Sequence, residues 1–138
     1  MADPLATSAQ ILALLRSVPD RVAHDGFVPE KLPQTGSYVD PYTVLWAGVG
    51  ADPDELTSDG IQDASTLVYD FQTTAVGPTA ETCRAVAVAD RGALLNKRVG
   101  RGIIRTNPDG FNQQAPILDT QTTPARFMLP QQWRLITN

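Results

Sequence analysis

Cysteine, histidine and long apolar runs are scarce in this chain of 138 residues, and each shortage removes a class of protein. Cys83 is the only cysteine, which excludes an intrachain disulfide framework and a metal cage built from thiolates. The apolar runs fall well short of the roughly 18–20 residues that a membrane-spanning helix needs. The N-terminus lacks a basic start followed by an apolar core, so we expect no secretory signal and synthesis in the cytoplasm.

Aromatic residues are also few, at 7% of the sequence, whereas there are eleven prolines and ten glycines. This length suits one domain spanning residues 1–138, which can bury about two-thirds of its unfolded surface. The many turn-forming residues predict long loops around a smaller compact part.

Basic residues are missing from the middle of the chain. Residues 32–83 contain eight acids and no Lys or Arg, whereas residues 84–138 contain eight bases and three acids. A subunit with an acidic part and a basic part can associate head to tail, and such contacts close into rings. The alternative is that both sets of charges are simply solvated.

The strongest structural pattern lies in residues 65–95. Its first part alternates apolar and polar residues with a period of two, which predicts a strand with one buried face. Gly77-Pro78 ends this strand, and Thr79 with Glu81 predicts the capped start of a helix over residues 79–95. Gly92 costs that helix roughly 1 kcal/mol relative to Ala, which suggests close packing at this point.

The other expected elements complete an α+β fold. Residues 3–18 predict an amphipathic helix, and residues 21–24 and 42–47 predict two strands. Residues 106–138 predict a loop and a β-like C-terminal arm, in which Pro130 belongs at an edge or a bulge. We therefore expect an antiparallel sheet of about four strands, two helices packed on one face, long loops and an extended C-terminal arm.

None of the candidate chemical sites is complete. His24 precedes Asp25, but neighbouring residues on a strand point to opposite faces. Cys83 lies early in a helix without a second histidine and acid, which favours a buried inert thiol. Residues 52–63 lack the spacing of a calcium loop, and the glycine pairs at 48–50 and 100–102 lack the context of a phosphate loop. We expect no catalytic residue, metal site or cofactor.

A basic cluster follows the second helix and comprises Lys97, Arg98, Arg101 and Arg105. It could contact phosphate, but it has no interleaved aromatic residues for stacking on bases, and the whole chain is acidic. A subunit contact or a solvated loop fits these residues better than specific binding of nucleic acid.

The arrangement of the whole chain resembles the tail terminator, or tail completion, proteins of long-tailed bacteriophages. The resemblance covers most of residues 5–100. It is carried by the opening helix, residues 22–29 (Val-x-x-Asp-Gly-x-x-Pro) and residues 42–46 (Tyr-Thr-Val-Leu-Trp) before a glycine-rich loop. The most specific part is the strand at residues 71–77 (Phe-Gln-Thr-Thr-Ala-Val-Gly), which runs into a helix with Ala-Asp-Arg at residues 89–91.

This resemblance implies a structural virion protein and no enzyme. Tail terminators form a hexameric ring on the tail tube, stop tube polymerisation and offer a docking surface for the head-completion complex, while DNA passes through the lumen without specific binding. A head–tail connector or neck protein is an alternative structural role, and a small cytoplasmic enzyme using Cys83 or His24 is a third. The residues expected at subunit or partner contacts are Asp52, Asp54, Glu55, Asp59, Lys97, Arg98, Arg101, Arg105 and Trp133.

Overall fold

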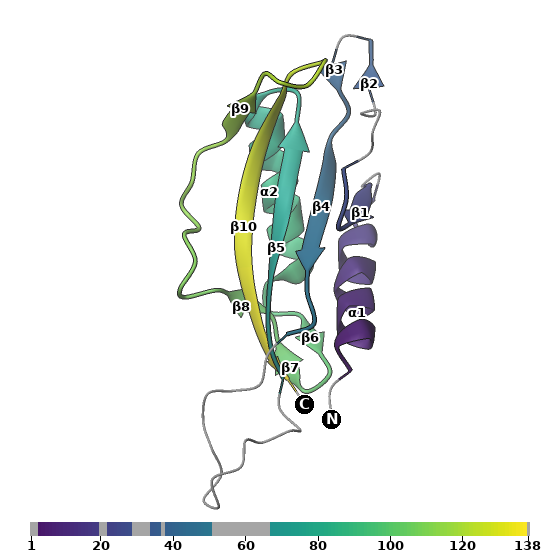
Figure 1. The fold of residues 1–138 in the computed structure, drawn as a ribbon, viewed down its shortest axis with the longest axis vertical. Coiled ribbons are helices and arrows are strands. Elements are labelled where there is room, and N and C mark those ends of the chain that lie inside the picture. The colour runs from purple at the N-terminus through teal and green to yellow at the C-terminus, as the bar shows by residue number, and fades with distance from the viewer. Residues whose placement is uncertain (1–2, 20–21, 29–33, 37, 51–66, 138) are drawn as a thin grey trace, which may run out of the picture.

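The computed structural model describes residues 3–19, 22–28, 34–36, 38–50 and 67–137, which contain two helices and ten strands (Figure 1). The two helices lie on one side of a sheet that runs along the length of the molecule. The elements, in chain order, are α1 (Pro4–Arg16), β1 (Ala23–Asp25), β2 (Gln34–Thr35), β3 (Tyr38–Val39), β4 (Tyr42–Ala47), β5 (Leu67–Gly77), α2 (Ala80–Leu94), β6 (Arg98–Val99), β7 (Gly102–Ile103), β8 (Arg105–Thr106), β9 (Ile117–Asp119) and β10 (Arg126–Thr137).

The main sheet has six strands. Five follow the order β1-β4-β5-β10-β8, and β9 pairs with β10 on the same edge as β8 but farther along the strand. Its pairs are antiparallel except for β1 and β4, which run parallel. The α+β class predicted from the sequence is therefore confirmed, but the sheet is mixed and not purely antiparallel. Residues 26–41 separate β1 from β4, and a parallel pair needs a connection of about this length because the chain must return to the same end of the sheet.

The C-terminal residues form a long strand inside the sheet and not an extended arm, which corrects the expectation from the sequence. Strand β10 pairs with β5 from Phe127 opposite Gly77 to Thr137 opposite Leu67. Pro130 is tolerated because it lies between the segments of β10 that pair with β9 and with β8. The N–H and carbonyl of Gln132 point away from β5, toward the outer edge of β10. Backbone groups two residues apart on a strand point the same way, so the position where Pro130 lacks an N–H also faces this outer edge and costs no bond to β5.

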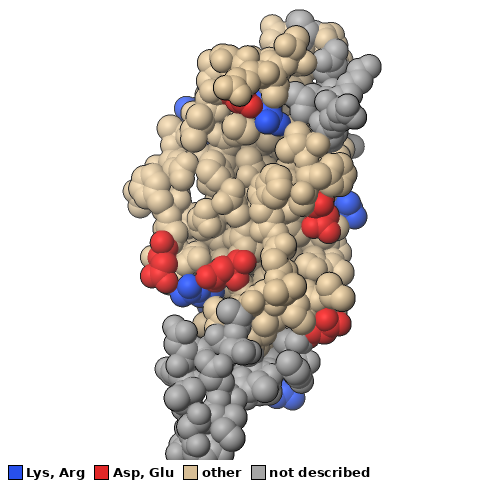
Figure 2. Space-filling view, viewed as in Figure 1, with Lys and Arg blue, Asp and Glu red and all other residues tan. Residues whose placement is uncertain are grey.

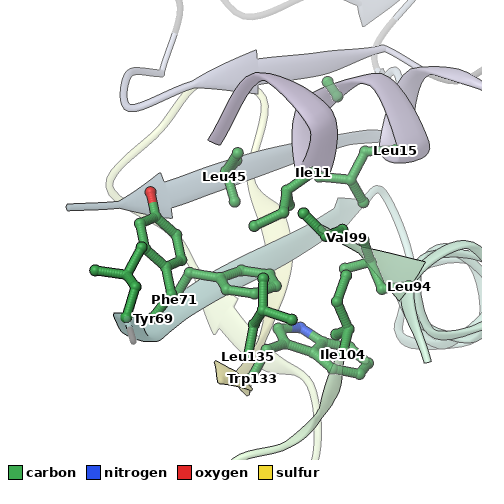
Figure 3. Close-up of a cluster of buried hydrophobic side chains, with 12 residues drawn as sticks. Ile11, Leu15, Leu45, Tyr69, Phe71, Leu94, Val99, Ile104, Trp133 and Leu135 are labelled. Carbon is green, nitrogen blue, oxygen red and sulfur yellow. The ribbon is translucent and has the colours of Figure 1, made fainter. Parts of the chain in front are cut away.

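One face of the sheet carries both helices and the main core (Figure 3). Tyr69 and Phe71 of β5 and Trp133 of β10 pack there with Ile11 of α1 and Leu94 of α2, and all five side chains are buried. This is the apolar face that the alternation of residues 67–75 predicts. Both helices lie on this face because each helix has one apolar stripe to bury against the sheet.

The predicted strand and helix of residues 65–95 form a single tight unit. At the turn, a Cβ on Gly77 would lie 2.8 Å from the backbone nitrogen of Cys83, so only glycine allows β5 to pass this close to α2. Thr79 caps α2 by accepting a hydrogen bond from the Thr82 N–H at 3.1 Å. The suggestion of close packing at Gly92 was wrong, because this residue is exposed and no atom lies within 4 Å of a Cβ built on it.

A smaller cluster lies at one end of the opposite face of the sheet. Val39, Tyr42, Val44 and Val76 are buried there, with Met128 packed against them. The rest of this face carries mostly polar side chains, and no described helix covers it.

Candidate interaction surfaces

The four predicted basic residues lie on one structural unit, which we call the basic hairpin (residues 97–105). Strands β6 and β7 pair in this hairpin, and β8 follows directly. The side chains of Lys97, Arg98, Arg101 and Arg105 are all exposed. Within the part of the chain that the structure describes, no acidic side chain forms an ion pair with any of them.

The sheet holds the basic hairpin rigidly, although its strands have only two residues each. The Thr137 hydroxyl accepts hydrogen bonds from the N–H groups of Arg101 and Gly102, at 3.1 and 3.2 Å, and donates one to the Val99 carbonyl at 3.0 Å. A Cβ on Gly102 would lie 2.2 Å from the Ile136 carbonyl oxygen, so a glycine is required where the hairpin crosses β10. The four cations consequently project from a fixed backbone.

The predicted acidic contact residues Asp52, Asp54, Glu55 and Asp59 lie outside the described residues. The described chain on either side of them ends close to the basic hairpin. Leu67 pairs with Thr137 across the sheet, and Thr137 bonds to the hairpin. The described residues that flank this segment thus lie at the same end of the molecule as the basic hairpin.

Trp133 is buried in the core and is not a surface contact. Its side chain is 1% exposed, stacks on Phe71 at 6.4 Å between ring centroids, and donates from Nε1 to the Thr73 hydroxyl at 3.0 Å. The sequence expectation of a partner contact at this residue is therefore corrected. Trp133 lies on the helix-covered face of β10, where the indole satisfies its only polar atom within the sheet.

The two candidate catalytic side chains are unsuited to catalysis. Burial raises the pKa of the Cys83 thiol to about 11, and its Sγ lies 3.4 Å from the Ala75 carbonyl oxygen. Burial and the charge of Arg16 lower the pKa of His24, whose buried Nε2 has no hydrogen-bond partner among the described residues. The His24 ring packs against the rings of Phe27 and Tyr42, at 5.2 and 5.7 Å. A nucleophile needs an activated thiolate and a positioned base, and these side chains provide neither.

One buried carboxylate belongs to α2 and serves the fold. Asp90 and Thr43 are both fully buried, and the Thr43 hydroxyl lies 2.7 and 3.0 Å from the two carboxylate oxygens. This contact ties α2 to β4 across the core.

No group of three or more potential metal-binding side chains occurs among the described residues. Neither of the two helices in the described ranges is long and apolar enough to cross a membrane.

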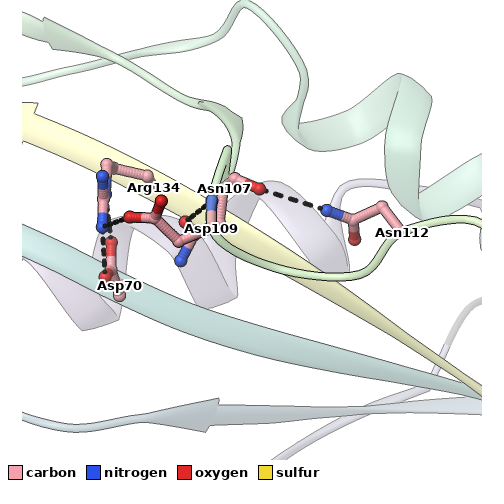
Figure 4. A network of polar contacts seen from close by, with 5 residues as sticks. All are labelled: Asp70, Asn107, Asp109, Asn112 and Arg134. Carbon is pink, nitrogen blue, oxygen red and sulfur yellow. Dashed lines mark hydrogen bonds and ion pairs between the residues drawn. The ribbon is translucent and has the colours of Figure 1, made fainter.

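The open face of the sheet carries a polar network that the sequence analysis did not identify (Figure 4). Arg134 forms a bidentate ion pair with Asp70, at 2.8 and 3.0 Å, and contacts Asp109 at 3.3 Å. Asp70 and Arg134 are direct neighbours across β5 and β10. Their opposite charges could have indicated this pairing only if the register of the two strands were known.

Charged groups are otherwise sparse over the middle of this open face (Figure 2). Neutral side chains form a ladder there, in which Gln132 donates to Gln72 at 2.8 Å and the Trp46 indole donates to the Thr74 hydroxyl at 3.2 Å. Trp46 is nevertheless 40% exposed. The middle of this face is therefore polar and mostly neutral.

Large apolar side chains are also exposed on the excursion between β8 and β10. Phe111 is 65% exposed, and Ile117 and Leu118 of β9 are each 51% exposed. The sequence predicts only a loop here, because isolated apolar residues among Gln, Thr and Pro carry no periodic signal.

No protein-family model matches this sequence, and no curated protein matches it at a significant level.

Proposed function

We propose that this chain is a structural protein of a bacteriophage virion that caps the tail tube as a ring. In this role it stops polymerisation of the tube and provides the surface on which the head docks. It acts without a cofactor or a catalytic site, and it is assembled in the cytoplasm of the host before becoming part of the tail and neck.

The observation that carries this proposal is the unit formed by β5 and α2. The residues with the most specific resemblance to tail terminators, 71–77 and 79–95, lie together in one strand, one tight turn and one helix at the centre of the fold. Gly77 is required in that turn, and Thr79 caps the helix. The residues that carry the resemblance therefore form one continuous structural unit.

The character of the exposed surfaces supports an assembly role over an enzymatic one. Cys83 is a buried thiol with a raised pKa, and His24 lacks an orienting partner among the described residues. By contrast, the four cations of the basic hairpin and the apolar residues of β9 are exposed, and most side chains of the open sheet face are partly exposed. Such surfaces are those through which a subunit contacts its neighbours.

The separation of charge along the chain suits a ring of identical subunits. A heterologous contact joins two different surfaces, so it can place the acidic residues Asp52, Asp54, Glu55 and Asp59 of one copy near the basic hairpin of the next. We propose a hexamer, which contacts the tube on one side and the head-completion or connector protein on the other. An acidic lumen would let DNA pass without gripping its phosphates.

Deletion of the gene from the phage that carries it tests this role. The expected result is overlong tails that are not joined to heads, visible by electron microscopy of lysates. Tails of normal length beside separate heads would instead indicate a neck or connector protein, and normal infectious particles would refute a structural role. A matched rescue with the double variant Cys83→Ala, His24→Ala should restore normal tails, because neither side chain performs chemistry.

A further inference from the structure

An apolar groove lies on the helix-covered side of the molecule, at the β1 edge of the sheet. It has a volume of about 460 Å³, and Ala85 and Val86 of α2 line it together with Pro19, Val22 and Pro41. Asp40 is the one charged residue among the described lining residues. Val22 is 49% exposed although it is apolar. A groove of this size can accept several atoms of an apolar side chain, since ligand pockets start at about 300 Å³.

A projecting apolar side chain lies at the opposite edge of the same sheet. Leu118 of β9 is 51% exposed, and the outer edge of β9 has no paired strand among the described residues. Leu118 lies directly opposite Phe127 in β10. Directly opposite residues of paired strands point to the same face of a sheet.

The groove and Leu118 match in face and in height. Phe127 is opposite Gly77, and the odd-numbered residues of β5, such as Ala75, face α2. Leu118 therefore points to the helix-covered side, where the groove also lies. Tyr42 is opposite Val76 of β5, which places the adjoining Pro41 of the groove at the same end of the sheet as Gly77 and β9. Strands β9 and β1 lie at opposite edges of the sheet (Figure 1).

We propose that Leu118 of one copy inserts into the groove lined by Val22, Pro41 and Ala85 of a second copy of this chain. This inference rests on the proposed function, since it names the two surfaces that join neighbouring subunits. The projection and the groove lie on opposite edges of the sheet, at the same position along the strands. Successive copies joined by this contact would therefore be related without a shift along the strand direction. A heterologous contact of this kind closes into a ring when the rotation between successive copies closes, and it gives an open filament when it does not.

Leu118 acts as the anchor of a larger contact. A stable interface buries about 800 Å² on each partner, which is far more than one leucine side chain supplies. Binding energy nevertheless concentrates in a few side chains that fill pockets near the centre of an interface. Val88, which is 68% exposed on α2 and follows Ala85 by three residues on the same side of the helix, can add apolar area around the anchor.

Two variants at exposed positions test the contact. Leu118→Ser removes the projection, and Ala85→Glu places a charged side chain in the groove while preserving helix propensity. Each variant alone should weaken self-association by about 10- to 100-fold, the loss expected when burial of one leucine is removed. Leu5→Ser, at a 75% exposed residue of α1, is the control and should associate like the unaltered chain. Sedimentation velocity measures association, and circular dichroism confirms that all variants fold.

An equimolar mixture of the two variants is the decisive sample. Leu118→Ser keeps an intact groove and Ala85→Glu keeps an intact projection, so the mixture should form a dimer of the two and grow no further. Rings formed by either variant at the affinity of the unaltered chain would overturn the inference, as would a mixture that remains monomeric. An unaltered chain that stays monomeric up to about 1 mM would overturn it as well.

The association measurements and the gene deletion test the two proposals independently. If deletion gives overlong tails while the variants assemble normally, the terminator role stands and this contact is wrong. If the mixture dimerises while deletion leaves the particles normal, the contact stands and the terminator role is wrong.

Discussion

Replacement of Trp133 by alanine tests the position of this residue in the core. The side chain is 1% exposed, stacks on Phe71 and bonds to the Thr73 hydroxyl. A buried tryptophan removes about 150–250 Å² from water, which at about 25 cal/mol per Å² gives at most ~4–6 kcal/mol. Compactness of the unfolded chain reduces this figure by roughly 10–40%, whereas the cavity and the lost hydrogen bond add to it. We expect Trp133→Ala to lower the free energy of unfolding by about 3–5 kcal/mol.

Urea unfolding followed by circular dichroism measures this loss. With a slope of roughly 2 kcal/mol per M for a chain of this size, the midpoint should fall by about 2 M. Trp133→Phe keeps an aromatic ring next to Phe71 but leaves the Thr73 hydroxyl without its donor, so it should cost about 1–2 kcal/mol. Trp46→Phe is the matched control at a 40% exposed tryptophan and should change stability by less than about 1 kcal/mol. A loss below about 1 kcal/mol in Trp133→Ala, together with impaired assembly, would refute the core position and restore a surface role.

Two further predictions concern the thiol and the imidazole. Cys83 in the folded protein should react with Ellman's reagent at pH 8 at least about 100-fold more slowly than in urea, because a thiol pKa of about 11 leaves little thiolate; equal rates would contradict its burial. His24 should make stability fall as the pH drops below about 6.5, because the unfolded chain takes up a proton that burial and Arg16 resist in the folded state. His24→Phe should lose this component between pH 7.5 and 5.5 in urea titrations, and an unchanged pH dependence in the variant would show that other groups cause it.

The physical patterns in the sequence were sufficient for the central elements. The alternation in residues 67–75 and the cap at Thr79 predicted β5 and α2 correctly because both signals are local, arising from side-chain direction along a strand and from a hydroxyl near free backbone N–H groups. The grouping of the four basic residues was also visible as a cluster in the sequence, and the structure places all of them on one exposed hairpin.

The sequence was misleading where a residue's surroundings come from distant parts of the chain. The C-terminal residues were expected to form an extended arm, yet β10 pairs with β5 from Phe127 to Thr137. Pro130 fits there because, among the described residues, no strand pairs on its outer side, which agrees with the edge position expected for it. Gly92 suggested close packing and instead lies exposed. Neither outcome is encoded in the neighbouring residues.

The sequence by itself determined the class of fold, the main strand and helix, and the separation of acidic from basic residues. Only the tertiary structure decided that β1 joins β4 in parallel, that Trp133 is buried, and that the projection at Leu118 and the apolar groove lie at opposite edges of one sheet. The physical reason is that strand order and register bring together residues far apart in the chain. Periodicity records which way a side chain points, but not which element lies in that direction.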